Sequence, residues 1–202
     1  MEEFNIVIAG VGGQGILLAA EIMGTAAVNE GLNVRVSEIH GMAQRGGAVV
    51  SNVRIGDKAA APTVLDGRAD VILGFEPLET LRNMKFASEK TLVLMSDEMI
   101  FPSGVADGST KYPSLEEVVR QVEGFTKNVI VVEAARMAVE TGNILTRNIV
   151  MIGALAAAGK VPLKIANVKN ALRELVPAKY LEANVKAFEL GYKHAKEKRV
   201  KR

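Results

Sequence analysis

The stretch FNIVIAGVGGQG, residues 4–15, decides the fold. Its first half is a short, fully apolar run, typical of a strand that is buried on both faces of a sheet. Its second half, GVGGQG at residues 10–15, fits the pattern G-x-G-x-x-G with one extra glycine, and a long helical pattern follows to about residue 31. A strand, a glycine-rich turn and a helix in this order predict the start of a layered α/β fold.

The rest of the chain repeats this alternation of strands and helices. Strand-like runs occur at residues 32–38, 48–56, 70–75, 91–96 and 128–134. Apolar strands separated by helices predict a mainly parallel, Rossmann-like sheet with helices on both faces. The connection between the second and third strands is too short for a parallel crossover, so we expect an antiparallel excursion there.

Residues 114–117, SLEE, form a capping box that predicts the start of a helix. From residue 134 onward the pattern is helical, and two amphipathic helices are separated near Pro177. We therefore predict one α/β domain over residues 1–202, with a helical C-terminal extension from about residue 160.

Composition excludes several classes of site. The chain has no cysteine, so it forms no disulfide and ligates no iron–sulfur cluster, and its only two histidines, His40 and His194, argue against a zinc site. No apolar run is long enough to span a membrane, and the acidic start MEEF differs from the basic start of a signal peptide. We expect a cytoplasmic protein with no metal site and no membrane partner.

Charge is concentrated at the C-terminus. Residues 193–202, KHAKEKRVKR, contain six basic residues and one acidic residue, whereas the whole chain has a formal net charge of only +2. Such a tail could bind nucleic acid or an acidic partner. The simpler interpretation is the solvated end of a helix, where cations interact favourably with the helix dipole. We therefore expect no nucleic-acid partner.

The glycine-rich turn is the first candidate binding site, with Gly10, Gly12, Gly13, Gln14 and Gly15 as its residues. In a dinucleotide site the first glycine permits the tight turn, the second lets a phosphate approach backbone amides, and the third allows close packing of the helix. Glu38 lies at a spacing suited to a ribose hydroxyl. The alternative is a tight turn that holds no nucleotide, and the residues alone leave both open.

The second candidate is the loop SEIHGMAQRGG at residues 37–47, which contributes His40, Gln44, Arg45, Gly46 and Gly47. Its glycines permit close approach to another surface. The planar fork of Arg45 suits a phosphate or a carboxylate, and the imidazole of His40 can titrate near neutrality or form a hydrogen bond. We expect this loop to complete a site shared with another chain. The alternative is that its polar side chains only fix the loop.

Other features have structural interpretations. Glu76 and Glu79, which flank Pro77, suit the first turn of a helix. Arg147 and Asn148 begin the apolar, small-residue segment NIVMIGALAAAG, for which core packing is the first interpretation and a subunit interface the second.

Taken together, these motifs resemble the gamma-type domain of the 2-oxoacid:ferredoxin oxidoreductases. The turn GVGGQG and the loop SEIHGMAQRGGAVVSNVRIG carry the resemblance, which continues through ADVILGFEPLETLR, KYPS and GNILTRNIVMIGALAAAG. The form HGMAQRGG is most similar to the beta-subunit branch of the indolepyruvate enzymes. The alternative branches are the gamma subunits for pyruvate or 2-oxoglutarate.

The resemblance implies an enzyme that oxidatively decarboxylates 2-oxoacids with coenzyme A and reduces ferredoxin. It also implies that thiamine diphosphate, Mg²⁺ and the iron–sulfur clusters lie on a large alpha subunit, and that coenzyme A is a co-substrate. This chain would then have no catalytic residue and would contact ferredoxin only indirectly. Its buried-looking helices would also allow the isolated chain to homodimerise. A free-standing NAD(P)-dependent dehydrogenase and a non-enzymatic binding module are the other hypotheses.

Overall fold

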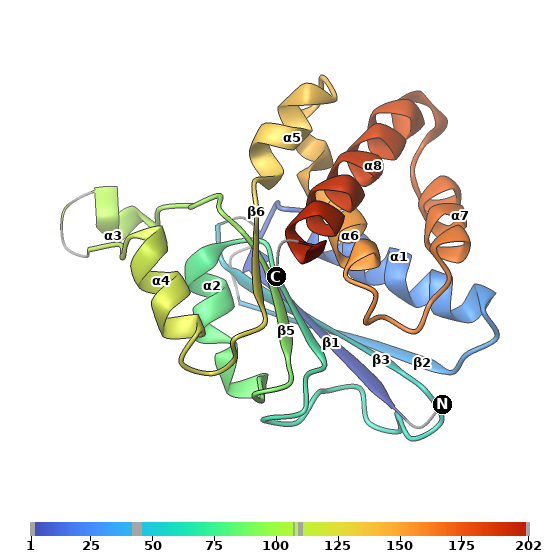
Figure 1. Ribbon diagram of the computed structural model, residues 1–202, viewed down its shortest axis with the longest axis horizontal. Coiled ribbons are helices and arrows are strands. Elements are labelled where there is room, and N and C mark those ends of the chain that lie inside the picture. The colour runs from blue at the N-terminus through green and yellow to red at the C-terminus, as the bar shows by residue number, and fades with distance from the viewer. Residues whose placement is uncertain (1–2, 42–45, 107, 109–110, 201–202) are drawn as a thin grey trace.

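The computed structural model describes residues 3–41, 46–106, 108 and 111–200. Within these residues, six strands form one sheet with helices on both faces (Figure 1). The strands are β1 (Phe4–Val11), β2 (Val34–His40), β3 (Ala48–Ile55), β4 (Val71–Gly74), β5 (Leu92–Ser96) and β6 (Val129–Val132). Their order is β2-β3-β1-β4-β5-β6, and β1, β4, β5 and β6 are mutually parallel. The predicted mainly parallel α/β fold is confirmed.

Strand β3 is the antiparallel member, because it runs opposite to both of its neighbours. It lies between β1 and β2, with Val53 paired to Ile6 on one side and to Val36 on the other. The predicted antiparallel excursion is therefore confirmed. Its insertion next to β1 was not predicted, and it moves β2 to the edge of the sheet.

Helices cover the two faces of the sheet unequally (Figure 1). One face carries α2 (Pro77–Arg82) and α4 (Leu115–Val122), and the other carries α1 (Ile16–Asn29), α5 (Ala134–Glu140), α6 (Arg147–Ala157), α7 (Ile165–Leu175) and α8 (Ala178–Val200). Short elements are α3 (Ser103–Ala106) and the 3₁₀ helices η1 (Met84–Phe86) and η2 (Ile144–Thr146). The predicted capping box at Ser114 and Glu117 is confirmed at the start of α4.

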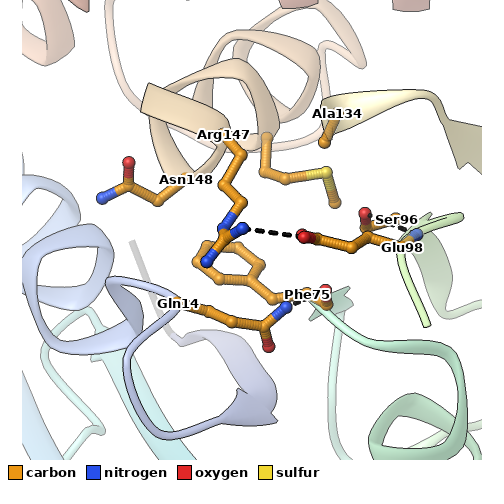
Figure 2. Close-up of a pocket in the computed structure, with 8 residues that line it drawn as sticks. Gln14, Phe75, Ser96, Glu98, Ala134, Arg147 and Asn148 are labelled. Atoms are coloured by element: carbon orange, nitrogen blue, oxygen red, sulfur yellow. Dashed lines mark hydrogen bonds and ion pairs between the residues drawn. The ribbon is translucent and has the colours of Figure 1, made fainter. Parts of the chain in front are cut away.

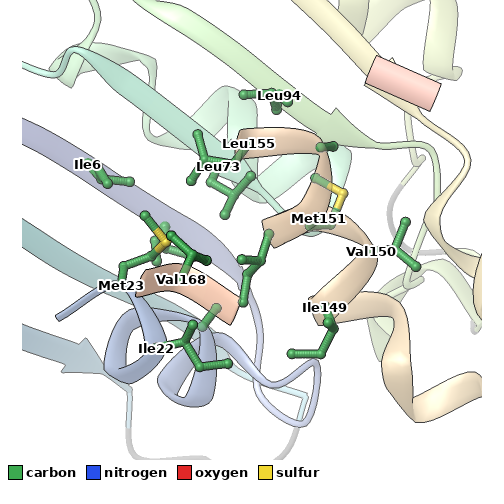
Figure 3. Packing of buried hydrophobic residues seen from close by; sticks show 14 of the residues in the cluster. Ile6, Ile22, Met23, Leu73, Leu94, Ile149, Val150, Met151, Leu155 and Val168 are labelled. Atoms are coloured by element: carbon green, nitrogen blue, oxygen red, sulfur yellow. The ribbon is translucent and has the colours of Figure 1, made fainter. Parts of the chain in front are cut away.

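Alternate side chains of β1, β3, β4, β5 and β6 supply two hydrophobic clusters. In β1, Ile6 and Ile8 face the larger cluster under α1 and α6, whereas Val7 faces the smaller one under α2 and α4. Figure 3 shows the larger cluster, where side chains of β1, β4 and β5 meet Met23 of α1 and Leu155 of α6. Full burial of such side chains stabilises the fold by roughly 1.5–3 kcal/mol each, so this cluster anchors the C-terminal helices on the sheet.

Helices α6 and α8 pack backbone to backbone. A Cβ added to Gly153 would lie 2.1 Å from the carbonyl oxygen of Phe188, and one added to Gly191 would lie 1.9 Å from that of Val150. Only glycine fits at either position. The first interpretation of the small-residue segment, core packing, is therefore confirmed.

Among the described helices, none combines the length and the apolar character that crossing a bilayer would require.

Candidate functional site

The carboxyl ends of the four parallel strands form one edge of the sheet. The chain leaves β1 toward β2 through α1 on one face, and leaves β4 toward β5 through α2 on the other. The connections thus diverge between β1 and β4, which makes this point the topological switch point where open α/β sheets bind ligands. The glycine-rich turn lies at this point.

The side chain of Gln14 spans the switch point. Its Oε1 accepts a hydrogen bond from the backbone N–H of Val11 at 2.8 Å, and its Nε2 donates to the carbonyl of Phe75 at 2.8 Å. The residue is 3% exposed. Gln14 therefore ties the end of β1 to the residue that follows β4, and both of these hydrogen bonds lie within the chain. Figure 2 shows the side chain of Gln14 beside Phe75.

The glycines of the turn are explained by close packing. A Cβ on Gly10 would lie 2.7 Å from Gln14 Oε1, and a Cβ on Gly15 would lie 2.4 Å from Asn148 Nδ2. Gly13 and Gly15 have φ values of 102° and 79°, which favour glycine. The N–H of Gly12 donates to the carbonyl of a loop residue at 2.8 Å, so the amide expected to meet a phosphate already has a partner. The tight-turn interpretation accounts for these contacts without a nucleotide.

The end of the β2–β3 loop lies against this turn. Gly12 N–H donates to the carbonyl of Gly47, and Gly46 N–H donates to the carbonyl of Gly12 at 3.4 Å, which continues the β1–β3 pairing beyond the strands. His40 is exposed, with Nδ1 3.3 Å from the carbonyl oxygen of Gly41. The structure thus joins the two candidate segments. Gln44 and Arg45 lie outside the described residues.

The N-terminus of α6 closes the crevice at the switch point. Arg147 Nη1 lies 2.7 Å from Glu98 Oε1, and Asn148 Nδ2 donates to the carbonyl of Gly15 at 3.4 Å. Figure 2 shows the crevice, which leaves no room for a water molecule between its walls. Its lining residues are Gln14, Phe75, Ser96, Glu98, Ala134, Arg147, Asn148 and Met151. Among the described residues, Glu98 Oε2 is buried without a hydrogen-bond partner. The crevice is therefore filled by the chain's own side chains.

A second polar cluster surrounds Glu76, directly after β4. Its Oε2 accepts from the N–H of Glu79 at 2.7 Å and caps α2, while its Oε1 accepts from the hydroxyl of Tyr112 and from the N–H of Ile100 at 3.4 Å. Burial, followed by the hydrogen bond to Glu76, raises the pKa of Tyr112 well above its ordinary value. Burial also raises the pKa of Glu79, against the opposing charge of Arg82. The helix-start interpretation of Glu76 and Glu79 is confirmed.

The position of Glu38 does not support a dinucleotide site. Glu38 pairs with Ser51 of β3, and Ser51 pairs with Ile8 of β1. Glu38 therefore lies two strands from β1, about 10 Å across the sheet. A ribose above the end of β1 would be out of its reach. A dinucleotide-binding dehydrogenase would therefore lack both the acidic residue expected to bind the ribose and an open crevice for the cofactor.

The residues present do not fit an iron–sulfur cluster or, in the described part of the chain, a bound metal ion. Iron–sulfur clusters require cysteine thiolates or comparable ligands, and the chain has no cysteine. Within the described ranges, no group of three His, Cys, Asp or Glu side chains is arranged to hold a metal ion. At the described part of the carboxyl edge the chain can offer a shaped, partly charged wall, but no nucleophile with an adjacent base.

Sequence reasoning missed several residues of this edge. Phe75, Glu98 and Tyr112 were not candidates, and Asn148 was not expected to contact Gly15, which lies 133 positions earlier. Most of them share a signal, because Phe75, Tyr112 and Asn148 come from the segments GFEP, KYPS and TRN that carry the family resemblance. The structure brings GFEP and TRN to the glycine-rich turn, through Phe75 and Asn148, and brings KYPS to Glu76 through Tyr112.

Comparison with known proteins gives the family. The model of the pyruvate ferredoxin/flavodoxin oxidoreductase family matches residues 5–194, so the chain belongs to this family. It is similar to indolepyruvate oxidoreductase subunit IorB of Pyrococcus horikoshii, with 48% identity over 98% of each chain. The common gamma subunit of pyruvate/ketoisovalerate oxidoreductases of Pyrococcus abyssi is 29% identical over 88% of this chain and 89% of its own.

A solved structure shows the same fold. The keto/oxoacid ferredoxin oxidoreductase gamma subunit of Geobacter sulfurreducens superimposes with a TM-score of 0.70 over 95% of this chain and 98% of its own, at 24% identity. The architecture described above is therefore the fold of this family.

Proposed function

We propose that this chain is the small subunit of an indolepyruvate:ferredoxin oxidoreductase, which oxidatively decarboxylates aryl 2-oxoacids to acyl-coenzyme A and reduces ferredoxin. The 48% identity to an indolepyruvate oxidoreductase subunit, against 29% to a pyruvate/ketoisovalerate gamma subunit, favours this branch. The structural observation that carries the proposal is the convergence of the family segments GFEP and TRN on the glycine-rich turn, at the carboxyl ends of the parallel strands.

The reacting groups belong to a large alpha subunit in this proposal. Thiamine diphosphate with Mg²⁺ would supply the chemistry of decarboxylation there, and the iron–sulfur clusters would pass electrons to ferredoxin. The absence of cysteine in this chain supports that division of labour. The isolated chain is then inactive, and we expect the complex to lie in the cytoplasm, where ferredoxin and coenzyme A occur.

The chain's own contribution is the shape of the cleft wall. The buried bridge of Gln14 and the contact of Asn148 with Gly15 fix the carboxyl edge, and the pairing of Gly12 with Gly47 fixes the end of the β2–β3 loop against it. A loop anchored at this end can present His40, Gln44 and Arg45 to a neighbouring subunit. We place this loop at the active-site cleft, near substrate or coenzyme A.

Substitution of Arg45 tests this placement. In the assembled complex, Arg45→Ala removes one charged hydrogen-bonding group, worth about 1.5–3 kcal/mol, so we expect a change of about 10- to 150-fold in kcat/KM or in the KM for coenzyme A. Arg120→Ala, on the exposed side of α4, is the matched control and should leave both unchanged. Unchanged kinetics for Arg45→Ala in a correctly assembled complex would remove the loop from the cleft.

Substrate preference distinguishes the branches of the family. The reconstituted complex should give a higher kcat/KM with indolepyruvate than with pyruvate or 2-oxoglutarate. A preference for either small 2-oxoacid would assign the chain to the corresponding gamma-subunit branch instead.

A further inference from the structure

An apolar groove runs between α1 and the edge strand β2, on the side of the molecule away from α2 and α4. Its volume is about 660 Å³. Three apolar side chains that line it are solvent-exposed: Leu17 by 46%, Val28 by 60% and Val36 by 41%. Apolar side chains gathered in one groove often mark a contact surface. We call this feature the α1–β2 groove.

The α1–β2 groove is acidic. Glu21 of α1, Glu38 of β2 and Glu174 of α7 line it, all three are exposed, and its lining in the described part of the chain includes no lysine or arginine. Because the exposed apolar side chains lie among exposed carboxylates, the charge of the groove complements a basic segment.

The strand that forms one wall of the groove also has an open backbone edge. The carbonyl of Asn33 and the N–H of Gly41, at the two ends of β2, both bond to the backbone at the ends of β3. Backbone direction alternates along an antiparallel strand, so the N–H and C=O groups of odd-numbered residues face β3. Those of Val36, Glu38 and His40 therefore face away from the sheet.

Little in β2 protects this edge. Natural edge strands are commonly blocked by proline, by charged side chains, especially lysine, or by a bulge. VRVSEIH contains no proline and no lysine, pairs with β3 in continuous register, and has Arg35 and Glu38 as its charged residues. The guanidinium of Arg35 bonds the carbonyl of Val34 within the strand at 3.0 Å. Val36, Glu38 and His40 are all exposed residues, and the strand leads directly into the β2–β3 loop.

We propose that the α1–β2 groove binds an extended, basic segment of the large subunit, which adds a seventh strand to the sheet beside β2. The backbone of that segment pairs with Val36, Glu38 and His40, its apolar side chains fill the groove, and its basic side chains meet the glutamates. The proposal rests on the proposed function, because it takes the large subunit as the partner. It goes further because it names the edge strand β2 as the docking site on this chain. The β2–β3 loop, which we place at the shared cleft, follows directly after this strand.

Charge argues against a second copy of this chain in the groove. Pairing of β2 with its own copy about a twofold axis would place two sets of Glu21, Glu38 and Glu174 at one interface. Like charges brought together in this way oppose association. A basic partner gains from the same charges.

Hydrogen exchange tests the pairing residue by residue. In the isolated chain, the amides of Val36, Glu38 and His40 should exchange quickly, whereas those of the odd-numbered residues between them are protected by β3. On binding of the purified large subunit, these three amides should slow at least tenfold and the odd-numbered amides should change little. Equal exchange of the three amides in the free chain and in the complex would overturn the proposal.

Variants test the same surface by affinity. Val36→Pro removes an outward N–H without removing a bond to β3, a position that tolerates proline in edge strands. Glu21→Lys with Glu38→Lys reverses the charge. Each should raise the Kd for the large subunit at least tenfold, and the charge variant should lose most of its salt dependence. The control, Glu116→Lys with Glu182→Lys on the exposed sides of α4 and α8, makes the same charge change and should leave Kd unchanged.

The outcomes separate this proposal from the proposed function. If the wild-type chain forms no active complex with the large subunit, the proposed function fails. If an active complex forms and the groove variants bind as tightly as the control, only the docking site is wrong. If the isolated chain is a dimer that Val36→Pro dissociates, a second copy occupies the groove and the assignment to the large subunit is overturned.

Discussion

Replacement of Gln14 by alanine tests the interpretation of the glycine-rich turn as an internally bonded structural turn. The substitution leaves the N–H of Val11 and the carbonyl of Phe75 without their partners, and both hydrogen bonds are buried and 2.8 Å long. A buried polar group left without a partner costs about 1–3 kcal/mol, and two such groups give an expected loss of about 2–6 kcal/mol in the free energy of unfolding. For a chain of this size that loss lowers Tm by roughly 4–24 °C.

A glutamate at the same position adds a pH signature. Gln14→Glu retains the acceptor for Val11 but replaces the donor to Phe75 with a carboxylate. Burial and the facing carbonyl should raise the pKa of this carboxyl above the ordinary value of about 4.3. Its protonated form is favoured in the folded state. The destabilisation is therefore small below the unfolded pKa, grows as pH rises from the unfolded to the folded pKa, and is complete above the folded pKa.

Urea unfolding followed by circular dichroism measures both effects. The control residue is Gln121, which is exposed on α4. Gln121→Ala and Gln121→Glu should stay within about 0.5 kcal/mol of the wild type. If Gln14→Ala also stays within that range, or if Gln14→Glu shows no more pH dependence than its control, the bridge across the switch point is not a structural tie and the turn must be reconsidered as a ligand site.

Three further substitutions test other contacts. Gly153→Ala should destabilise by about 1–3 kcal/mol in thermal unfolding, because its Cβ would force α6 and α8 apart, and a neutral result would contradict the backbone contact. Tyr112→Phe removes a hydrogen-bond donor to the buried Glu76 and should lower the free energy of unfolding by about 1.5–3 kcal/mol. In a spectrophotometric titration the same variant should leave the tyrosine ionisation step near pH 10 unchanged, because the pKa of Tyr112 is raised above that range. Hydrogen bonds from Asn5 and Arg54 lower the pKa of Glu3. The ionised Glu3 therefore stabilises the folded chain above about pH 4.5, and this contribution is lost as pH falls through the folded pKa. Glu3→Gln should be destabilised at pH 7 and converge with the wild type at low pH in urea titrations, and a constant difference would refute this linkage.

Local patterns in the sequence predicted the elements well. The helix after the glycine-rich turn, the capping box at Ser114 and the helix start at Glu76 depend on neighbouring residues, and all three were found. The antiparallel excursion followed from the length of one loop. Each of these features depends on residues that are close together in the sequence, so periodicity and capping rules are sufficient to predict it.

Pairing between distant segments was not accessible in the same way. Nothing in the residues of β3 indicates that it pairs with β1 as well as β2, and this placement removes Glu38 from the switch point. The burial of Gln14 depends on a carbonyl 61 residues away, and the close packing of Gly15 depends on Asn148. Glycines in a binding fingerprint and glycines required by internal packing have the same sequence pattern, and only the three-dimensional contacts separate them.

The most direct test of the account is reconstitution with the large subunit. The purified chain, alone and mixed with a separately purified large subunit, is assayed for coenzyme A-dependent oxidation of indolepyruvate coupled to ferredoxin reduction. We predict no activity from either chain alone, a stable complex in size-exclusion chromatography with light scattering, and turnover only from that complex. Full activity of the large subunit alone, or no association between the two chains, would contradict the assignment of this chain as a structural partner in the active site.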